Sequence, residues 1–391
     1  MADTTKQYIS ELKLRGAHYR ILAVASMEQV IGAGLSTISG IIIPIIALLH
    51  GSSLPVFLQG LLGASGLIGI ATGSMILGNL SDRYGYLFYF RLSPALILAG
   101  ALLIYFIPTL PVLLIGLFVI GFGVGGGYSL DGNYISQLMP IKWRLFMVGV
   151  AKATSSIGFF AVAGIAYIIL KDNFTPEHWN VLMLIIAALG GLTLLTRIWF
   201  RNSPRWLLSH GEYDKAQEAA HFFFGKNVYV KALSTDPKVT SPSYSSFLKG
   251  ENLKKVIYSG IPWACEGVGV YGVGVFLPIL VAALGIAGNS DATGLSHIIN
   301  SVELTAVINF FILPGFIMGL IAVRKMSHLR MLTGGFFVSA VALAMLFVAY
   351  HFKLPVWVSV VSFILFELFL NAGPHLVTFI IPDGIYKVED R

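Results

Sequence analysis

The stretch GNLSDRYG, residues 78–85, joins two long apolar runs, 57–80 and 88–107. Apolar runs near or above 20 residues recur along the chain, and about 20 such residues suffice to cross a hydrocarbon core of roughly 30 Å. The 391 residues are 56% hydrophobic and 12% charged, with a mean hydropathy of +0.80. Because so few charges could not cover the surface of a soluble domain, the sequence predicts a polytopic membrane protein.

We predict that the apolar runs form transmembrane helices. Strands of a membrane barrel alternate in polarity over about 10 residues, and these runs do not alternate. The expected fold class is therefore an all-α membrane protein. The ten predicted spans are residues 21–49, 57–80, 88–107, 110–138, 146–170, 178–200, 257–284, 298–323, 332–350 and 354–382.

The formal net charge of +7 follows the predicted loops. Lys and Arg residues precede the first span, follow the second, fourth, eighth and tenth, and gather between 201 and 256, whereas the opposite loops hold only Lys171 and Lys353. By the positive-inside rule, both termini and the 201–256 loop are expected on the cytoplasmic side of the cell (inner) membrane. The basic excess reports topology, so we expect no nucleic-acid partner.

Nothing in the sequence indicates enzymatic chemistry. Its single cysteine, Cys265, lies inside a predicted span, so no intramolecular disulfide can form. The histidines are scattered, without metal-ligand spacing or a nucleophile motif. We therefore expect no catalytic residue, no metal and no cofactor.

The two parts of the chain resemble each other at an offset of about 240 residues. The repeat predicts a six-helix bundle over 1–200, a loop with a short amphipathic helix over 201–256, and a four-helix bundle over 257–391. Two such halves are typical of secondary transporters, which bind substrate between them near mid-membrane. The matching positions are Pro44 with Pro278, 78–83 with 319–324, and Arg144 with Arg391.

The second part holds four predicted spans where the first holds six. We expect the coding sequence to continue into two further apolar spans. A ten-helix protein completed by a partner chain is the alternative.

Four stretches resemble the major facilitator superfamily. GNLSDRYG resembles its loop 2–3 signature, Gly-x-x-x-Asp-Arg-x-Gly, although Tyr86 and Leu87 replace the usual basic residues. NSPRWL (202–207) resembles the Glu-Ser-Pro-Arg-Trp-Leu block of sugar porters. GVGGGYSL (123–130) and NAGPHLVTFIIPDGIYKVEDR (371–391) resemble helices 4 and 10 of phosphate and organic-acid proton symporters, with Gly127 in place of a carboxylate.

The resemblance implies a secondary active transporter of the major facilitator type. Such a protein moves a small polar organic solute, of the sugar or organic or aromatic acid type, by alternating access coupled to protons. An uncoupled facilitator and a degenerate paralogue acting as a sensor or assembly partner are the alternatives. The loop-motif residues that it implies as gating or ordering groups are Gly78, Asp82, Arg83, Gly85, Arg144 and Arg205.

Ionisable side chains at membrane depth cost roughly 2.5–3.5 kcal/mol each, so each is a functional hypothesis. The resemblance implies a cavity lined by the first, fourth, seventh and tenth helices, and these carry Glu28, Asp131, Glu266 and Glu367. A desolvated carboxylate can load and release a proton. We therefore expect the solute, protons and the lipid bilayer as the partners of this protein.

Lys152 and Asp131 are equally far from the turn at 141–142, on neighbouring antiparallel spans. This matched depth predicts that the two side chains pair, and a purely structural pair is the alternative. The glycines at 121, 123, 125, 126 and 127 are expected to allow close helix packing rather than to bind phosphate. The segment 211–225 predicts a short amphipathic helix, and 226–250 a flexible linker.

Overall fold

The computed structural model describes residues 7–9, 12–51, 54–172, 174–230, 249–286 and 294–385. These residues are helical apart from turns and one parallel pair of two-residue strands, β1 (Gln7–Tyr8) and β2 (Val228–Tyr229). In this part of the chain, nine helices are long and apolar enough to cross a membrane, or ten when a bent pair is counted as one span. The predicted all-α membrane fold is confirmed.

The first part of the chain forms six spans at the predicted positions. The first is broken at Ser26 and the fifth at Thr154, and the Thr154 hydroxyl donates to the Ser26 carbonyl at 3.2 Å. The elements are α1 (Gly16–Ala25), α2 (Met27–His50), α3 (Val56–Tyr84), α4 (Tyr86–Phe106), α5 (Leu110–Leu138), η3 (Ile141–Trp143), α6 (Arg144–Ala153), α7 (Ser155–Lys171), η4 (Pro176–Leu182) and α8 (Met183–Arg197).

The last part forms four spans. The seventh span bends by 56° between Gly250–Val273 and Leu277–Ala283, after a π-helical turn. The tenth breaks at Gly373, directly before Pro374, which cannot donate a backbone hydrogen bond. The elements are α12 (Gly250–Gly267), η5 (Val268–Val273), α13 (Leu277–Ala283), α14 (Leu295–Phe310), α15 (Ile312–Ala322), α16 (His328–His351), α17 (Val356–Ala372) and α18 (Pro374–Ile385).

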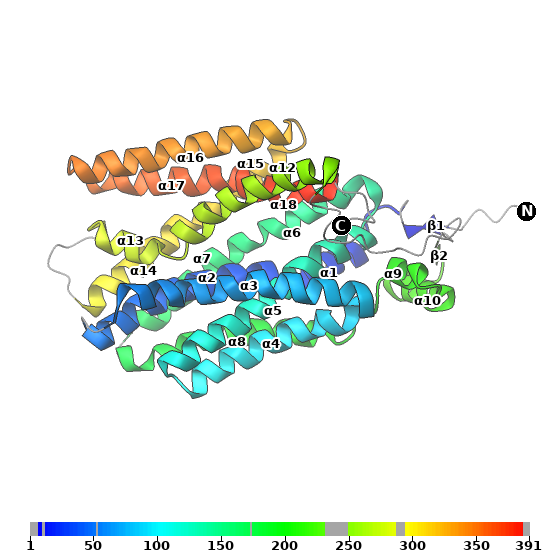
Figure 1. The fold of residues 1–391 in the computed structure, drawn as a ribbon, viewed down its shortest axis with the longest axis horizontal. Coiled ribbons are helices and arrows are strands. Elements are labelled where there is room, and N and C mark those ends of the chain that lie inside the picture. Colours follow the sequence, from blue (N-terminus) through cyan, green and yellow to red (C-terminus); the bar gives the residue numbers. More distant parts are fainter. Residues whose placement is uncertain are drawn as a thin grey trace, which may run out of the picture.

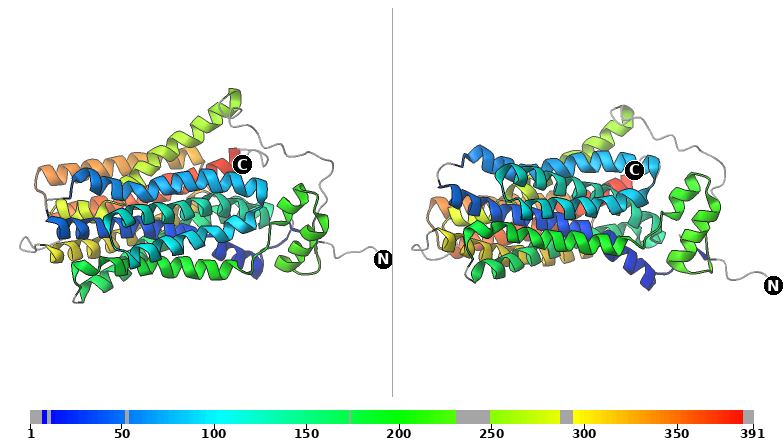
Figure 2. Two further views of the ribbon diagram at one scale, coloured as in Figure 1. Left: turned by 60° about the horizontal axis from the view of Figure 1, so that its bottom comes forward. Right: turned by 90° about the horizontal axis from the view of Figure 1, so that it is seen from below.

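Two short helices, α9 (Pro204–Ser209) and α10 (Tyr213–Phe224), follow the sixth span. They stand apart from the span helices at one end of the bundle, together with β1 and β2, whereas α13 lies toward the other end (Figures 1 and 2). The predicted amphipathic helix is thus confirmed as α10. Most of the predicted linker, residues 231–248, lies outside the described residues.

Glycines allow α3 and α5 to pack backbone against backbone. A Cβ added at Gly121 or Gly125 would overlap the backbone carbonyl of Gly66 or Ile70. Additions at Gly69 and Gly73 would overlap the facing backbone of α5 in the same way. The expected close packing by the glycines of the fourth span is confirmed at these positions.

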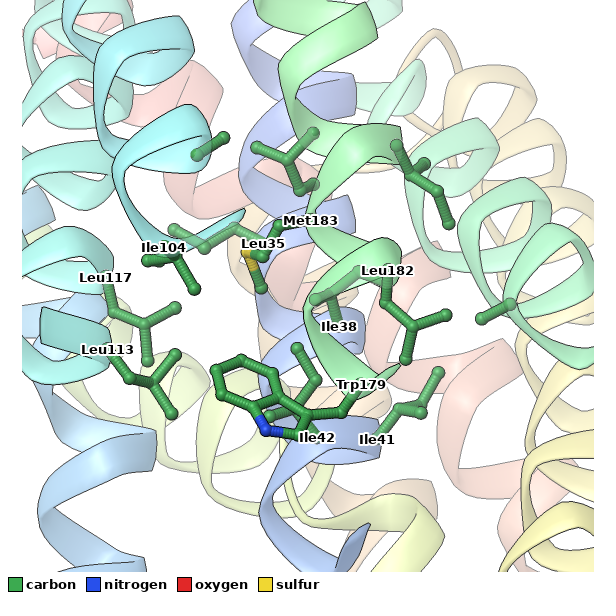
Figure 3. Packing of buried hydrophobic residues seen from close by; sticks show 14 of the residues in the cluster. Leu35, Ile38, Ile41, Ile42, Ile104, Leu113, Leu117, Trp179, Leu182 and Met183 are labelled. Carbon is green, nitrogen blue, oxygen red and sulfur yellow. The ribbon is translucent and has the colours of Figure 1, made fainter. Parts of the chain in front are cut away.

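The core of the first bundle is built from branched aliphatic side chains around α2. Leu35, Ile38 and Ile42 pack against residues of α4, α5 and α8, with the Trp179 ring at one end (Figure 3). In a bilayer such contacts stabilise by van der Waals packing rather than by removal of water. Packing of this kind fixes the rotation of α2, which carries Glu28 and Gln29.

The two bundles meet along helices from both parts of the chain. Helix α2 contacts α13 and α14, α7 contacts α14 and α15, and α6 contacts α15 and α18. The Asn309 amide of α14 donates to the Phe159 carbonyl of α7 at 3.3 Å. Lys152, described below, lies at this contact.

Candidate functional site

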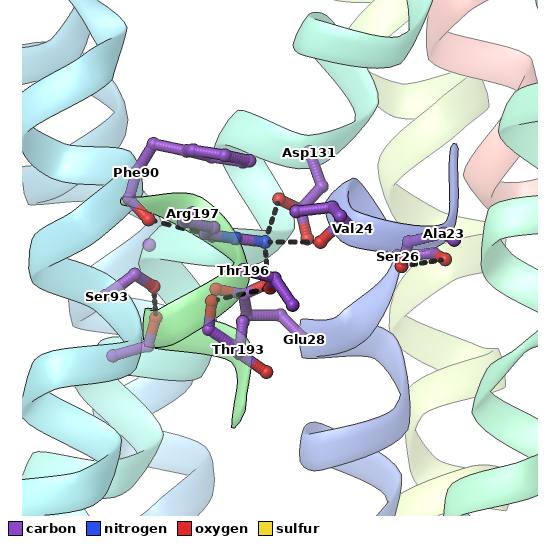
Figure 4. Close-up of polar contacts among 12 residues, drawn as sticks. Ala23, Val24, Ser26, Glu28, Phe90, Ser93, Asp131, Thr193, Thr196 and Arg197 are labelled. Carbon is purple, nitrogen blue, oxygen red and sulfur yellow. Dashed lines mark hydrogen bonds and ion pairs between the residues drawn. The ribbon is translucent and has the colours of Figure 1, made fainter. Parts of the chain in front are cut away.

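A buried three-charge cluster joins three spans of the first bundle. Arg197, at the end of α8, is fully buried and forms ion pairs with Glu28 of α2 and with Asp131 of α5, the latter at 3.0 Å (Figure 4). The guanidinium also donates to the Phe90 carbonyl at 3.0 Å and to the Val24 carbonyl at 3.2 Å. Its central carbon lies 3.6 Å from the centroid of the Phe90 ring. We call Glu28, Asp131 and Arg197 the charge cluster.

The charge cluster corrects the predicted pairing of Asp131 with Lys152. Asp131 faces α8 and pairs with Arg197, whereas Lys152 points to the contact between the halves. Arg197 was missed because it lies near the end of its span, where Lys and Arg usually snorkel to the interface. The sequence indicated Arg197 only indirectly, because two buried carboxylates, Glu28 and Asp131, require a cation at the same depth.

The charge cluster contains one carboxylate more than its cation can neutralise. Within the described residues, Glu28 Oε1 and Asp131 Oδ2 are buried and have no hydrogen-bond partner. A proton bound to either carboxylate would bring the net charge of the three groups to zero. It would also give the unpaired carboxylate oxygens a hydrogen-bond donor. The arrangement can therefore hold one proton in addition to its ion pairs.

A second polar group, which we call the polar chain, runs through the other bundle. Glu266 Oε1 of α12 lies 3.5 Å from His375 Nε2 of α18, and His375 Nδ1 lies 2.6 Å from Asn371 Oδ1 of α17. The Asn371 amide donates to Glu367 Oε2 at 3.1 Å. All four side chains are buried, with exposures of 1–4%.

The hydrogen bonds of the polar chain determine where its protons lie. Because the Asn371 amide nitrogen donates to Glu367, its oxygen accepts from His375, which places a proton on Nδ1. A neutral imidazole then presents an unprotonated Nε2 to the Glu266 carboxyl group. That contact is favourable only when a further proton, on Nε2 or on Glu266, lies between the two groups.

Lys152 stands at the contact between the halves. It is 5% exposed, and its Nζ lies 5.3 Å from the ring centroids of both Tyr128 (α5) and Phe379 (α18). In the described part of the chain no carboxylate lies within 4 Å of it, and Glu266 attracts it from a longer range. Tyr271 of η5 lies close to Tyr128 across the same contact. The structure thus brings Lys152, Glu266 and Glu367 into one region.

The loop-motif residues meet the segment that follows the sixth span. Trp206 Nε1 donates to the Asp82 carbonyl at 3.3 Å, and the Leu87 amide donates to the Asn202 side chain at 2.9 Å. The Tyr86 hydroxyl donates to Asp82 Oδ1 at 3.0 Å. These contacts join the two stretches that the sequence singled out separately.

The other implied loop-motif residues lie near the ends of helices. Gly78 faces Ser129 of α5, and an added Cβ would stand 3.1 Å from its hydroxyl. Arg83 is exposed in the last turn of α3, Arg144 begins α6, and Arg205 lies in the first turn of α9. Their gating role stays a prediction.

A surface cleft of about 470 Å³ opens at the same end of the bundle. It lies between the start of α4, residues 198–202 and α10, and Arg91, Arg201 and Lys215 are among its lining residues. No residue of the charge cluster or the polar chain lines it. The cleft therefore belongs to the loop face of the molecule rather than to the membrane-depth polar groups.

Two helical bundles with buried charges between and within them define a polytopic membrane transporter. A family profile described as "Sugar (and other) transporter" matches residues 26–391. The chain belongs to this family, and its fold is that of a major facilitator superfamily transporter.

Individual relatives and solved structures agree with this assignment. The chain is 27% identical over 350 residues to the inner membrane metabolite transport protein YgcS of Escherichia coli, covering 88% of this chain and 73% of YgcS. It is 25% identical over 328 residues to the glucose transporter GlcP of Staphylococcus epidermidis, covering 81% and 70%. The proton:xylose symporter XylE matches in fold with a TM-score of 0.77 at 18% identity, covering 95% of this chain and 83% of XylE. These similar proteins are transporters rather than enzymes.

Proposed function

We propose that this protein moves a small polar organic solute, of the sugar or organic acid type, across the cell membrane by alternating access coupled to protons. Relatives named as metabolite and glucose transporters, and a fold shared with a proton:xylose symporter, support the solute class. The loop charges support an orientation with both termini and the 201–256 loop in the cytoplasm.

The charge cluster is the observation that carries proton coupling. Arg197 balances one of the two buried carboxylates, Glu28 and Asp131, so the unprotonated cluster keeps one net negative charge at membrane depth. Such a charge is costly in a low-dielectric interior, and a proton removes it. A change of helix position that admits water to the cluster would then release the proton.

The contact between the halves is where alternating access would open and close the protein. Lys152 is attracted to Glu266, and Tyr128 lies close to Tyr271, so each pair joins one half to the other. Both interactions must separate when the halves move apart. A solute bound between the halves can therefore change the balance between closed and open arrangements.

Transport into proteoliposomes tests this proposal. We expect purified wild-type protein to accumulate a labelled solute, found by screening neutral and acidic hexoses, when an inward proton gradient is imposed. The variant Asp131→Asn keeps Arg197 paired with Glu28 and should fold. It should lose gradient-driven accumulation while retaining exchange of labelled for unlabelled solute.

The matched control is Glu303→Gln, which neutralises an exposed carboxylate of α14 outside both polar groups. Its accumulation should equal that of the wild type. Equilibration without accumulation by the wild type would favour the uncoupled facilitator. Full accumulation by Asp131→Asn would remove the charge cluster from the coupling mechanism.

A further inference from the structure

Gln29 is buried without any hydrogen bond to its side chain. It is 1% exposed, and both its amide nitrogen and its oxygen lack a partner within the described residues. The Ser155 hydroxyl is 1% exposed and is in the same situation. Leaving a buried polar group unsatisfied costs about 1–3 kcal/mol. Buried polar side chains that find no hydrogen-bond partner within the protein indicate that a bound molecule supplies the partner.

The neighbours of Gln29 along α2 show where its side chain points. A Cβ added at Gly32, three residues on, would overlap the Tyr128 hydroxyl, and Ala33, four residues on, faces Gly158 of α7. Gly40 lies eleven residues after Gln29, about three turns along, and therefore on the same side of the helix. A Cβ added there would overlap the Val275 carbonyl of the other half. Gln29 thus faces the contact between the halves, between α5 and α7.

Ser155 and Lys152 reach the same region from the fifth span. They are three residues apart, Lys152 in the last turn of α6 and Ser155 at the start of α7, on either side of the break at Thr154. The Thr154 hydroxyl between them bonds the Ser26 carbonyl, about one turn before Gln29. Lys152 also lies against Tyr128, the residue that faces Gly32. Helix α2 and the fifth span therefore bring an amide, a hydroxyl and an ammonium group to the same region, beside Tyr128 of α5.

We propose that Gln29, Ser155 and Lys152 form one wall of the solute site, and that the solute is a polyhydroxylated monocarboxylate, a sugar acid. This inference rests on the proposed transport function and names its substrate class. A glutamine amide both donates and accepts, as a pair of sugar hydroxyls does, and serine can do the same. The ammonium group of Lys152 matches one carboxylate. Tyr128 and Phe379 beside it offer ring faces to the apolar side of the carbon chain.

The position of Glu266 explains how binding of the acid is linked to a proton. Tyr128, Tyr271, Glu266 and His375 are the titratable groups that face Lys152 and its surroundings. When Glu266 takes up a proton it stops attracting Lys152, and the carboxylate of the solute takes its place. The anion of the solute and the proton on Glu266 together leave the net charge of the site unchanged.

Direct binding to the purified protein tests the substrate class. The probes are D-gluconate, D-glucose, which lacks the carboxylate, and propionate, which lacks the hydroxyls. We expect gluconate to bind at least tenfold more tightly than either and to raise the melting temperature of the protein. Equal affinity for glucose and gluconate would overturn the inference.

Variants test whether each of the three side chains contacts the solute. Lys152→Met should lower gluconate affinity tenfold or more, to about that for glucose. Gln29→Leu should weaken both gluconate and glucose, yet leave the melting temperature of the empty protein unchanged or higher, since it removes an unsatisfied group. Ser155→Ala should weaken binding, whereas its control, Ser156→Ala, should not, because the Ser156 hydroxyl already donates to the Ala153 carbonyl at 2.7 Å. Unchanged gluconate affinity in Lys152→Met and Gln29→Leu would overturn the assignment.

Uptake in proteoliposomes separates this inference from the transport function on which it rests. Accumulation of a neutral hexose with no uptake or binding of gluconate would overturn the inference and keep the function. Gluconate binding without uptake of any solute would keep the site and overturn the function. Absence of both binding and uptake across the panel would overturn both.

Discussion

The side chain of Glu28 occupies the space in which a side chain at Gly127 would lie. A Cβ added at Gly127 would stand 2.6 Å from the Glu28 Cβ and 2.7 Å from its carboxyl carbon. Gly127 is the position at which the resembling helix 4 pattern carries a carboxylate. In this protein the acidic group is delivered to the same place from α2 instead of α5, and it pairs there with Arg197.

Substitution of Gly127 should therefore displace Glu28. We expect Gly127→Ala to lower stability by about 1–3 kcal/mol, the usual cost of overpacking a buried site, and to abolish proton-driven uptake. The control is Gly164→Ala in α7, where an added Cβ meets nothing within 4 Å and alanine favours the helix. Thermal unfolding of the two purified variants measures the difference. Equal melting temperatures would show that Glu28 moves aside at no cost.

Removal of the cation should be more damaging than removal of one carboxylate. Arg197→Met leaves Glu28 and Asp131 buried together without a cation, which costs about 3–5 kcal/mol. Folded yield and melting temperature should fall sharply. Arg201→Gln removes the exposed ion pair with Glu218 and should change stability by no more than about 1 kcal/mol. Similar behaviour of the two variants would mean that the charge cluster does not hold its three helices.

Gly85 tests the contact between the loop motif and Trp206. Gly85 has φ 99° and ψ 149°, a conformation almost restricted to glycine, and an added Cβ would stand 3.1 Å from the Trp206 ring. Gly225 has similar angles, φ 93° and ψ 165°, with nothing within 4 Å. Both alanine variants should lose about 1–3 kcal/mol to backbone strain. Only Gly85→Ala should also slow transport. Equal transport rates in the two variants would mean that the contact of Gly85 with Trp206 is only structural.

Cysteine labelling in intact cells tests the proposed orientation. In a Cys265→Ser background, Lys353→Cys lies in the loop between α16 and α17, and Lys215→Cys lies on α10. A membrane-impermeant maleimide should label the first variant in intact cells and the second only after permeabilisation. The reverse pattern would invert the topology that the loop charges predict.

The spans were predictable because each is a long apolar run, and a span needs length and hydropathy more than specific residues. The fourth predicted span, 110–138, coincides with α5. Breaks inside spans were not predictable in this way. No proline or glycine marks the kink at Ser26, and the bend in the seventh span follows the π-helical turn η5.

The polar contacts were only partly predictable. Depth along an antiparallel pair follows from residue counting, and it placed Asp131 and Lys152 at one level. It does not give the rotation of each helix, which packing decides, so Asp131 faces α8 and Lys152 faces α18. The partners of Glu266 and Glu367 are His375 and Asn371, and neither is an acidic residue, a lysine or an arginine. A search restricted to charged residues could not find them.

The glycine contact between α3 and α5 also restricts how the first bundle can change shape. Backbone meets backbone near Gly69, Gly73, Gly121 and Gly125, so no side-chain rotamers exist there to absorb a sliding movement. The two helices can then travel only as one rigid unit, and Asp131 travels with them. During evolution, any larger residue at one of these four positions would have to arise together with a wider spacing of both helices. This pair is therefore less free to adapt to a new solute than a pair of helices packed through side chains.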